Sequence, residues 1–281
     1  MDLSVLQFLA APFAASLIIA GIHAYLGVHV VERGVIFVDL SLAQIAALGS
    51  TMALLVPFMG EDPHGSWAYW SSLAFTFVGA AVFSTIKARR ARIPQEAIIG
   101  ISYAVASAAT ILAMSKATSE AEHLKNMLVG NILAVSWQEV RATALLYTVI
   151  GIFHYVFRRR FLAISLNHDG VEAQGLSVRL WDFLFYASFG VMVTRSVSIA
   201  GVLLVFCYLI VPSVAAMLYA DRIGPRLAIG WTMGTVVSAL GIYLSVKLDL
   251  PTGATMVCTF GLVLILMAVA KPLVFRVLGK T

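Results

Sequence analysis

The chain has 281 residues, of which 60% are hydrophobic and only 12% are charged, and its mean hydropathy is +0.93. A water-soluble protein of this length would need a charged surface, so the composition excludes that class. The formal net charge is +5, but the basic residues follow the membrane segments described below, so no nucleic-acid partner is expected.

Apolar runs of about 20 residues recur along the chain, and a helix needs this length to cross a bilayer core. Because backbone polar groups in lipid must be satisfied within each segment, we predict an all-α polytopic membrane protein with eight or nine transmembrane helices. The first run lacks a basic n-region and is predicted to be a retained helix. The sixth range is short, so we expect it to be broken or tilted. The predicted ranges are 5–29, 34–57, 67–86, 97–114, 139–157, 181–193, 198–219, 227–246 and 253–270.

Lysine and arginine residues are distributed unevenly between the connecting segments. If the N-terminus is outside, the inner segments hold 14 of the 19 Lys and Arg residues. The positive-inside rule therefore predicts an N-out, C-in orientation. These inner residues are Arg33, Lys87, Arg89, Arg90, Arg92, Arg158, Arg159, Arg160, Arg179, Arg222, Arg226, Lys271, Arg276 and Lys280.

The longest inner segment, RRRFLAISLNHDGVEAQGLSVRLWD, exceeds what a simple connection needs. Asp169 can cap a short helix, Glu172 and Ala173 favour one, and Gly175 can end it. We predict an exposed docking helix at about 165–178, and the alternative is a surface turn.

Six stretches carry a family pattern by their order and spacing: VERGVIFVDLSLAQIAALGS, QEAIIGISYA, LVGNILAVSWQEV, VEAQGLSVRLWDF, VSIAGVLLVFCYLIVPSVAAMLYADR and LDLPTGATMVCTFGL. Together they resemble the permease subunit of the ABC importers for zinc, manganese and iron, and the resemblance covers nearly the whole chain. It implies the ABC importer permease fold, with one transmembrane permease domain over residues 1–281. It also implies a multi-pass protein of the cytoplasmic (inner) membrane of a prokaryote.

The resemblance further implies a homodimer with the translocation path between protomers, two cytosolic ABC ATPase subunits, and an extracytoplasmic metal-binding protein that delivers the ion. Glu172, Ala173 and Gly175 match the family's ATPase-contact signature, which would make 165–178 the coupling helix. The chain has no GxxxxGK[ST] phosphate loop. ATP would therefore be bound by the partner subunit, and we expect this chain to be no enzyme and to hold no cofactor of its own.

Ionisable groups inside a bilayer are costly, so each one is a functional hypothesis. The second apolar run contains Asp39, Ser41 and Gln44. The family pattern there has an arginine, an aspartate six residues later, and a histidine four residues after that. Arg33 and Asp39 keep this spacing, but the histidine position holds Ala43.

On a helix, positions 39 and 43 share a face, whereas Gln44 lies about 140° from Asp39. Asp39, Ser41 and Gln44 are our candidate metal-pathway residues. Gln44 would reach the same ion through a helix kink or from the second copy of the dimer, or it would instead form interhelical hydrogen bonds. An amide oxygen suits Mn²⁺ better than Zn²⁺, which argues against zinc. The sequence does not identify the ion, so the substrate class is zinc, manganese or iron.

Other polar residues have weaker assignments. The roles of His23 and His29 stay open: support of the pathway ligands from behind is a minor alternative for His23, and an interfacial pair with Glu32 is one for His29. We expect His154 to snorkel toward water. Arg195 would anchor the outer end of the sixth span or line a gate.

Small residues in the apolar runs favour packing roles. Gly230 and Gly234 form a GxxxG pair that allows close helix packing. Cys207 and Cys258 lack metal-ligand spacing and are predicted to be buried small hydrophobic residues.

The leading function is import of a divalent transition-metal ion by alternating access. An alternative is an ABC permease for a metal chelate such as a siderophore or cobalamin, although such permeases usually have ten spans. An ion-coupled secondary metal transporter would need more intramembrane carboxylates and an internal repeat. No hydrolase motif supports a membrane enzyme.

Overall fold

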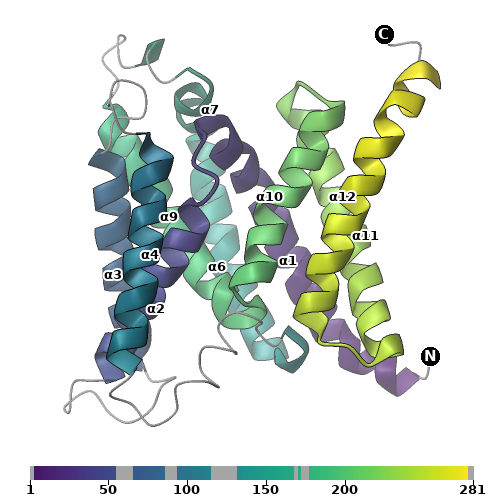
Figure 1. Cartoon of the computed structure of the whole chain (residues 1–281), viewed down its shortest axis with the longest axis horizontal. Helices are drawn as coiled ribbons and strands as arrows, with labels where there is room; N and C mark the ends of the chain where they lie inside the picture. The colour runs from purple at the N-terminus through teal and green to yellow at the C-terminus, as the bar shows by residue number, and fades with distance from the viewer. Residues whose placement is uncertain are drawn as a thin grey trace. The chain divides into compact units, whose positions relative to one another are not determined.

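The computed structural model describes residues 3–54, 66–85, 94–114, 132–167, 170–171 and 177–277, and every regular element among them is a helix (Figure 1). The all-α prediction is confirmed for this part of the chain. The helices are α1 (Leu3–Arg33), α2 (Val38–Leu54), α3 (Ser66–Thr85), α4 (Gln95–Met114), η1 (Ile132–Ala134), α6 (Trp137–Val156), α7 (Arg158–Leu166), α9 (Val178–Ala200), α10 (Val202–Tyr219), α11 (Ile223–Leu248) and α12 (Thr252–Val277).

Six of the described helices, namely α1, α4, α9, α10, α11 and α12, are long and apolar enough to cross a membrane. A seventh span results if α6 and α7, which meet at a 72° bend, are taken together. The shorter α2 is also apolar. These helices establish a multi-pass chain, and the full count of nine spans stays a prediction.

The chain divides into two compact units. Unit 1 comprises Met1–Val31, Val129–Gly151 and Ile199–Thr281, and unit 2 comprises Glu32–Leu128 and Ile152–Ser198. The expected single permease domain over residues 1–281 stays a prediction.

In unit 1, α10, α11 and α12 pack against one another. Tyr208 of α10 and Ser238 of α11 share a hydrogen bond of 2.7 Å, and Trp231 Nε1 donates to the Gly21 carbonyl of α1 at 2.8 Å. A Cβ atom on Gly27 of α1 would overlap the Leu209 carbonyl of α10. Glycine at that position therefore permits the close approach of α1 and α10.

Apolar side chains also cover the outside of unit 1, as expected of a surface that faces lipid. Val236, Leu262 and Ile265 are all more than half exposed. Cys207 is buried as predicted, but Cys258 is exposed on α12, so that half of the cysteine prediction is wrong. An apolar residue needs no protein cover where lipid is the solvent.

In unit 2, α2 packs against α3 and α4. Ser71 Oγ donates to the Gly49 carbonyl at 2.6 Å, and a Cβ atom on Gly49 would lie 2.8 Å from Phe75 Cβ. Further along α3, the hydroxyls of Thr76 and Thr194 lie 3.3 Å apart and join α3 to α9.

Two predicted helix boundaries are wrong. α2 begins at Val38 rather than at residue 34, because residues 34–37 form a connector that starts with Gly34 at φ +67° and ends α1. The sixth span is not short: α9 has 23 residues and continues past Arg195 to Ala200. Polar residues in its last turns remain helical, and Gly201 at φ +79° separates α9 from α10.

Local capping also explains why α6 starts where it does. The Glu139 N–H donates to Ser136 Oγ at 3.2 Å, while the Ser136 N–H donates to Glu139 Oε2 at 2.9 Å. This reciprocal capping box satisfies backbone donors that the first turn leaves free.

Candidate functional site

The candidate pathway residues lie in the first two turns of α2. Asp39 is 2% exposed, Ser41 is fully buried, and Gln44 is 7% exposed. Within the described part of the chain, Asp39 Oδ1 and Ser41 Oγ have no hydrogen-bond partner. A buried oxygen without a partner destabilises a fold by about 1–3 kcal/mol, and a bound ion or water is one reason for such an atom in a native protein.

Ala43 lies one turn beyond Asp39 and is 3% exposed, so the position where the family pattern has histidine faces the protein interior. α2 is a single helix from Val38 to Leu54, which keeps Gln44 on a different face from Asp39. Ser41 also lies about 160° around the helix from Asp39, and α2 carries no imidazole on the Asp39 face. In the described residues, no three His, Cys, Asp or Glu side chains gather closely enough to hold one metal ion.

The buried histidines make local contacts within their own units. In unit 1, His23 is fully buried and its Nδ1 lies 2.9 Å from the Ile19 carbonyl oxygen, so that nitrogen carries the proton. In unit 2, His154 is 1% exposed, its Nε2 lies 2.9 Å from Ser188 Oγ, and its ring stacks on Phe161 at 4.5 Å. The predicted snorkelling of His154 is wrong, because aromatic neighbours enclose the ring.

The contacts of His29 and Arg195 do not assign either residue a function. His29 is 1% exposed and packs edge-on against Tyr25 with ring centroids 4.7 Å apart. Arg195 is half-buried in α9, and its carbonyl accepts a hydrogen bond of 2.8 Å from Ser198 Oγ. The pairing of His29 with Glu32 stays a prediction, as does a gate at Arg195.

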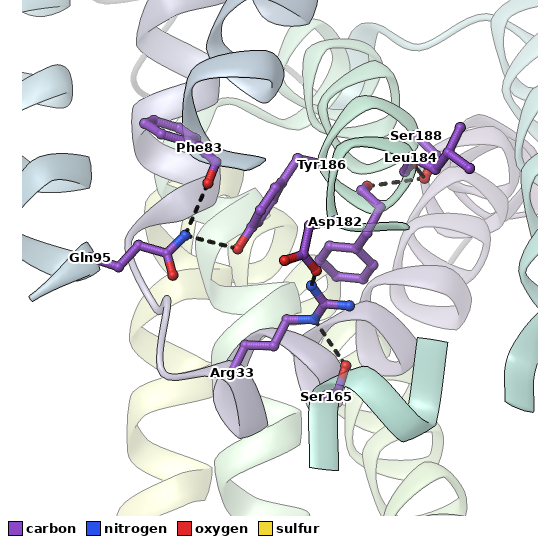
Figure 2. A network of polar contacts seen from close by, with 9 residues as sticks. Arg33, Phe83, Gln95, Ser165, Asp182, Leu184, Tyr186 and Ser188 are labelled. Carbon is purple, nitrogen blue, oxygen red and sulfur yellow. Dashed lines mark hydrogen bonds and ion pairs between the residues drawn. The ribbon is translucent and has the colours of Figure 1, made fainter. Parts of the chain in front are cut away.

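Arg33 is the centre of a polar network in unit 2. Its Nη1 donates to Asp182 Oδ1 of α9 at 2.6 Å, and its Nε donates to Ser165 Oγ of α7 at 2.9 Å. Figure 2 shows the guanidinium group between these two partners. Its carbon also lies 4.1 Å from the centroid of the Phe185 ring. The charge is thus held by an ion pair, a hydroxyl and an aromatic face.

A second arm of the network joins α3, α4 and α9. Gln95 Nε2 donates to the Phe83 carbonyl at 3.3 Å and to the Tyr186 hydroxyl at 3.2 Å (Figure 2). Next to it, Glu96 Oε1 accepts the Phe37 N–H at 3.1 Å. The Glu96 carboxylate therefore caps the backbone immediately before α2.

The sequence did not single out Asp182, Ser165 or Tyr186. An acid near the start of an apolar helix was a usable signal for Asp182, because such an acid needs a partner. Its partner is 149 residues away along the chain, which no local pattern indicates.

The remaining candidate residues are placed as follows. Glu172, Ala173 and Gly175 lie outside the described residues, as does half of the predicted coupling helix, namely 168–169 and 172–176. In unit 1, a Cβ atom on Gly230 would lie 3.3 Å from Ala24 Cβ, and one on Gly234 would lie 3.0 Å from Ala20 Cβ. The two glycines thus line the approach of α11 to α1, while their contribution to packing stays a prediction.

Comparisons with known proteins agree with this architecture. Residues 5–271 match the family described as ABC 3 transport family. Over 202 residues, 69% of this chain and 71% of the relative, the chain is 28% identical to the manganese transport system membrane protein MntC of Listeria innocua serovar 6a. Over 242 residues, 86% of this chain and 79% of the relative, it is 25% identical to the chelated iron transport system membrane protein YfeC of Yersinia pestis.

A solved structure shows the same fold. PsaBC from Streptococcus pneumoniae in complex with Fab is 20% identical, and the match has a TM-score of 0.76 and covers 92% of this chain and 90% of that one. The family predicted from the sequence motifs is confirmed, since the family match spans nearly the whole chain. This chain is a multi-pass prokaryotic membrane protein that belongs to the ABC 3 transport family.

Proposed function

We propose that this chain is the permease subunit of an ABC importer that moves a divalent transition-metal ion into the cytoplasm by alternating access. The observation that carries the proposal is the Asp39 carboxylate, which is buried in the first turn of α2 with Oδ1 unpartnered among the described residues. The name of one relative, a manganese transport system membrane protein, supports this class of substrate.

Manganese is the ion that the donor atoms favour. Asp39, Ser41 and Gln44 offer carboxylate, hydroxyl and amide oxygens, which suit Mn²⁺, whereas Zn²⁺ more often takes imidazole or thiolate ligands. Ala43 supplies no imidazole at the position where the family pattern has one. With Ser41 and Gln44 on a different face of α2 from Asp39, the second copy of a homodimer would complete the ligand set.

The remaining parts of the transporter come from partner chains. We assign ATP hydrolysis to separate cytosolic ABC ATPase subunits that dock on the 165–178 segment through Glu172, Ala173 and Gly175. An extracytoplasmic metal-binding protein would deliver the ion. The charge distribution and the predicted spans support nine transmembrane helices, surrounded by membrane lipid, with the N-terminus outside and the C-terminus inside.

Transport by the complete complex in proteoliposomes tests this function. We expect ATP-dependent uptake of Mn²⁺ in preference to Zn²⁺, and we expect Asp39→Asn to lower that uptake by about tenfold or more, as losses at metal sites commonly do. Ser50→Ala on the same helix is the matched control, because Ser50 Oγ donates only a local hydrogen bond of 2.9 Å to the Ala47 carbonyl.

Two results would contradict the proposal. Normal Mn²⁺ uptake by an Asp39→Asn complex that assembles fully would remove Asp39 from the path. Uptake that proceeds without ATP would indicate an ion-coupled secondary carrier instead.

A metal chelate is the second candidate, and the named relationship to a chelated iron transport protein favours it. A chelated ion already has its ligands, so its transport would not depend on the Asp39 carboxylate. Uptake of ferric siderophore or cobalamin that persists in Asp39→Asn, with no uptake of free Mn²⁺, would select this alternative.

A further inference from the structure

The connector between α1 and α2 is held at both of its ends. On the α1 side, Arg33 Nη1 donates to Asp182 Oδ1 at 2.6 Å. On the α2 side, the Phe37 N–H donates to Glu96 Oε1 at 3.1 Å. Asp39 follows only two residues later, so these two contacts set where the start of α2 lies.

The first turns of α9 make the contact to Arg33 directly. Asp182, Phe185 and Tyr186 are spaced three and four residues apart, so they share one face of α9. Asp182 forms the ion pair, and the Arg33 guanidinium carbon lies 4.1 Å from the Phe185 ring centroid and 5.9 Å from that of Tyr186. One face of α9 therefore holds the charge at the end of α1.

The same face of α9 reaches the other end of the connector through α4. The Tyr186 hydroxyl accepts a hydrogen bond of 3.2 Å from Gln95 Nε2. Gln95 precedes Glu96, whose carboxylate accepts the Phe37 N–H. A displacement of α9 would therefore act on both ends of the connector.

The Arg33–Asp182 ion pair is better suited to specify geometry than to add stability. The two side chains are 7% and 13% exposed, and the desolvation of such a pair offsets much of its attraction. The pair is nevertheless short, charge-assisted and stacked on an aromatic ring, which leaves it a single favourable arrangement. Arg33 and Asp182 should therefore move together.

We propose that Arg33, Asp182 and Tyr186 are positioning residues that make the start of α2, and with it Asp39, follow the movement of α9. The inference rests on the proposed function, because α9 begins at Val178, directly after the predicted ATPase-contact residues in the sequence. A movement that the ATPase imposes on the coupling segment would thus reach the carboxylate of the ion path through the α9 ion pair.

The test is the number of Mn²⁺ ions moved per ATP hydrolysed by the complete transporter in proteoliposomes. Asp182→Asn removes the ion pair, and we expect this ratio to fall by about fivefold or more, the lower end of typical coupling effects. A merely structural role would lower the amount of assembled complex and would reduce ATP hydrolysis and uptake in proportion.

Two further variants complete the experiment. Thr194→Val removes the Thr76–Thr194 contact of α9 at 3.3 Å and leaves the connector untouched, so it should keep the wild-type ratio. Arg33→Lys keeps a charge opposite Asp182 but loses the donor to Ser165 and the planar face on Phe185. The Arg33→Lys complex should assemble and move a number of Mn²⁺ ions per ATP between those of the wild type and Asp182→Asn. If Asp182→Asn fails to assemble, a lowered ratio in Arg33→Lys still tests the proposal.

The proposal is overturned if Asp182→Asn and Arg33→Lys both keep the wild-type ratio, or if Thr194→Val lowers it equally. Failure of the proposed function gives a different pattern, because the unmodified complex would then show no ATP-dependent Mn²⁺ uptake. Wild-type uptake that is lost in Asp39→Asn, with unchanged ratios in both network variants, would retain the function and reject only the positioning role.

Discussion

At the residue scale, Ala43 leaves the position one turn beyond Asp39 without a ligand atom. The side chain lies one helical turn from the carboxylate and is 3% exposed. A methyl group there cannot bind a cation, so position 43 supplies no ligand atom on the Asp39 face of α2. Under the proposed function, this one small residue bears on which metal the path would accept.

Ala43→His should shift the preference of the transporter from Mn²⁺ toward Zn²⁺, because an imidazole at this position shares the face of α2 with Asp39. The measurement is the ratio of Zn²⁺ to Mn²⁺ uptake by the reconstituted complex. Ala43→Leu is the matched control, since it adds comparable bulk to the buried position without a ligand atom. Equal ratios in the two variants would show that position 43 lies off the ion path.

At the element scale, α1 contributes residues to both units, because the division between them falls in its last turn. Gly27 permits close packing on α10 in unit 1, and the last residue of α1, Arg33, enters the ion pair with α9 in unit 2. Gly34, at φ +67°, then ends the helix and turns the chain toward α2. The Asp39 end of α2 therefore depends on how α1 terminates.

Two glycines of α1 allow a paired test of this packing. A Cβ atom on Gly27 would overlap the Leu209 carbonyl oxygen and the Ser213 hydroxyl, whereas one on Gly21 would meet nothing within 4 Å. We expect Gly27→Ala to destabilise the protein by about 1–3 kcal/mol, as overpacking does.

Gly21→Ala should instead leave stability unchanged or raise it by up to about 1 kcal/mol, because alanine is the better helix former. Thermal unfolding of the purified permease in detergent measures both variants. An equal melting temperature for Gly27→Ala and the wild type would contradict the close approach of α1 and α10.

At the scale of the whole molecule, charge sets the expected orientation in the membrane. The inner segments carry most of the Lys and Arg residues under the N-out, C-in arrangement. That arrangement also places the 165–178 segment in the cytoplasm, where an ATPase subunit can reach it. The proposed transport cycle therefore requires this orientation.

Reporter fusions test the orientation. Alkaline phosphatase fused after the C-terminus should be inactive, because its disulfides form only outside the cytoplasm. The same reporter inserted into the 116–125 segment should be active, and a fluorescent protein that matures only in the cytoplasm should give the reverse pattern. An active phosphatase at the C-terminus would rule out the proposed orientation.

Much of the architecture was predictable because hydropathy and capping act over short distances along the chain. Each predicted span overlaps a helix of the structure, and Gly230 and Gly234 both lie on α11. The predicted start of α2 was wrong because Gly34, at positive φ, ends α1 and delays the next helix. The predicted end of the sixth span was wrong because polar residues such as Arg195 and Ser196 remain helical. Asp39 was predictable as a candidate, since a carboxylate in an apolar helix stands out in any sequence.

The sequence by itself determined the membrane class, the family, and the presence of Asp39 with alanine rather than histidine at position 43. Only the tertiary structure decided which side chains meet: Arg33 with Asp182, Gln95 with Tyr186, and His154 with Ser188. Local sequence specifies a helix because its hydrogen bonds are local. Pairing between helices depends on packing, which brings together residues that are far apart along the chain and have no pattern in common.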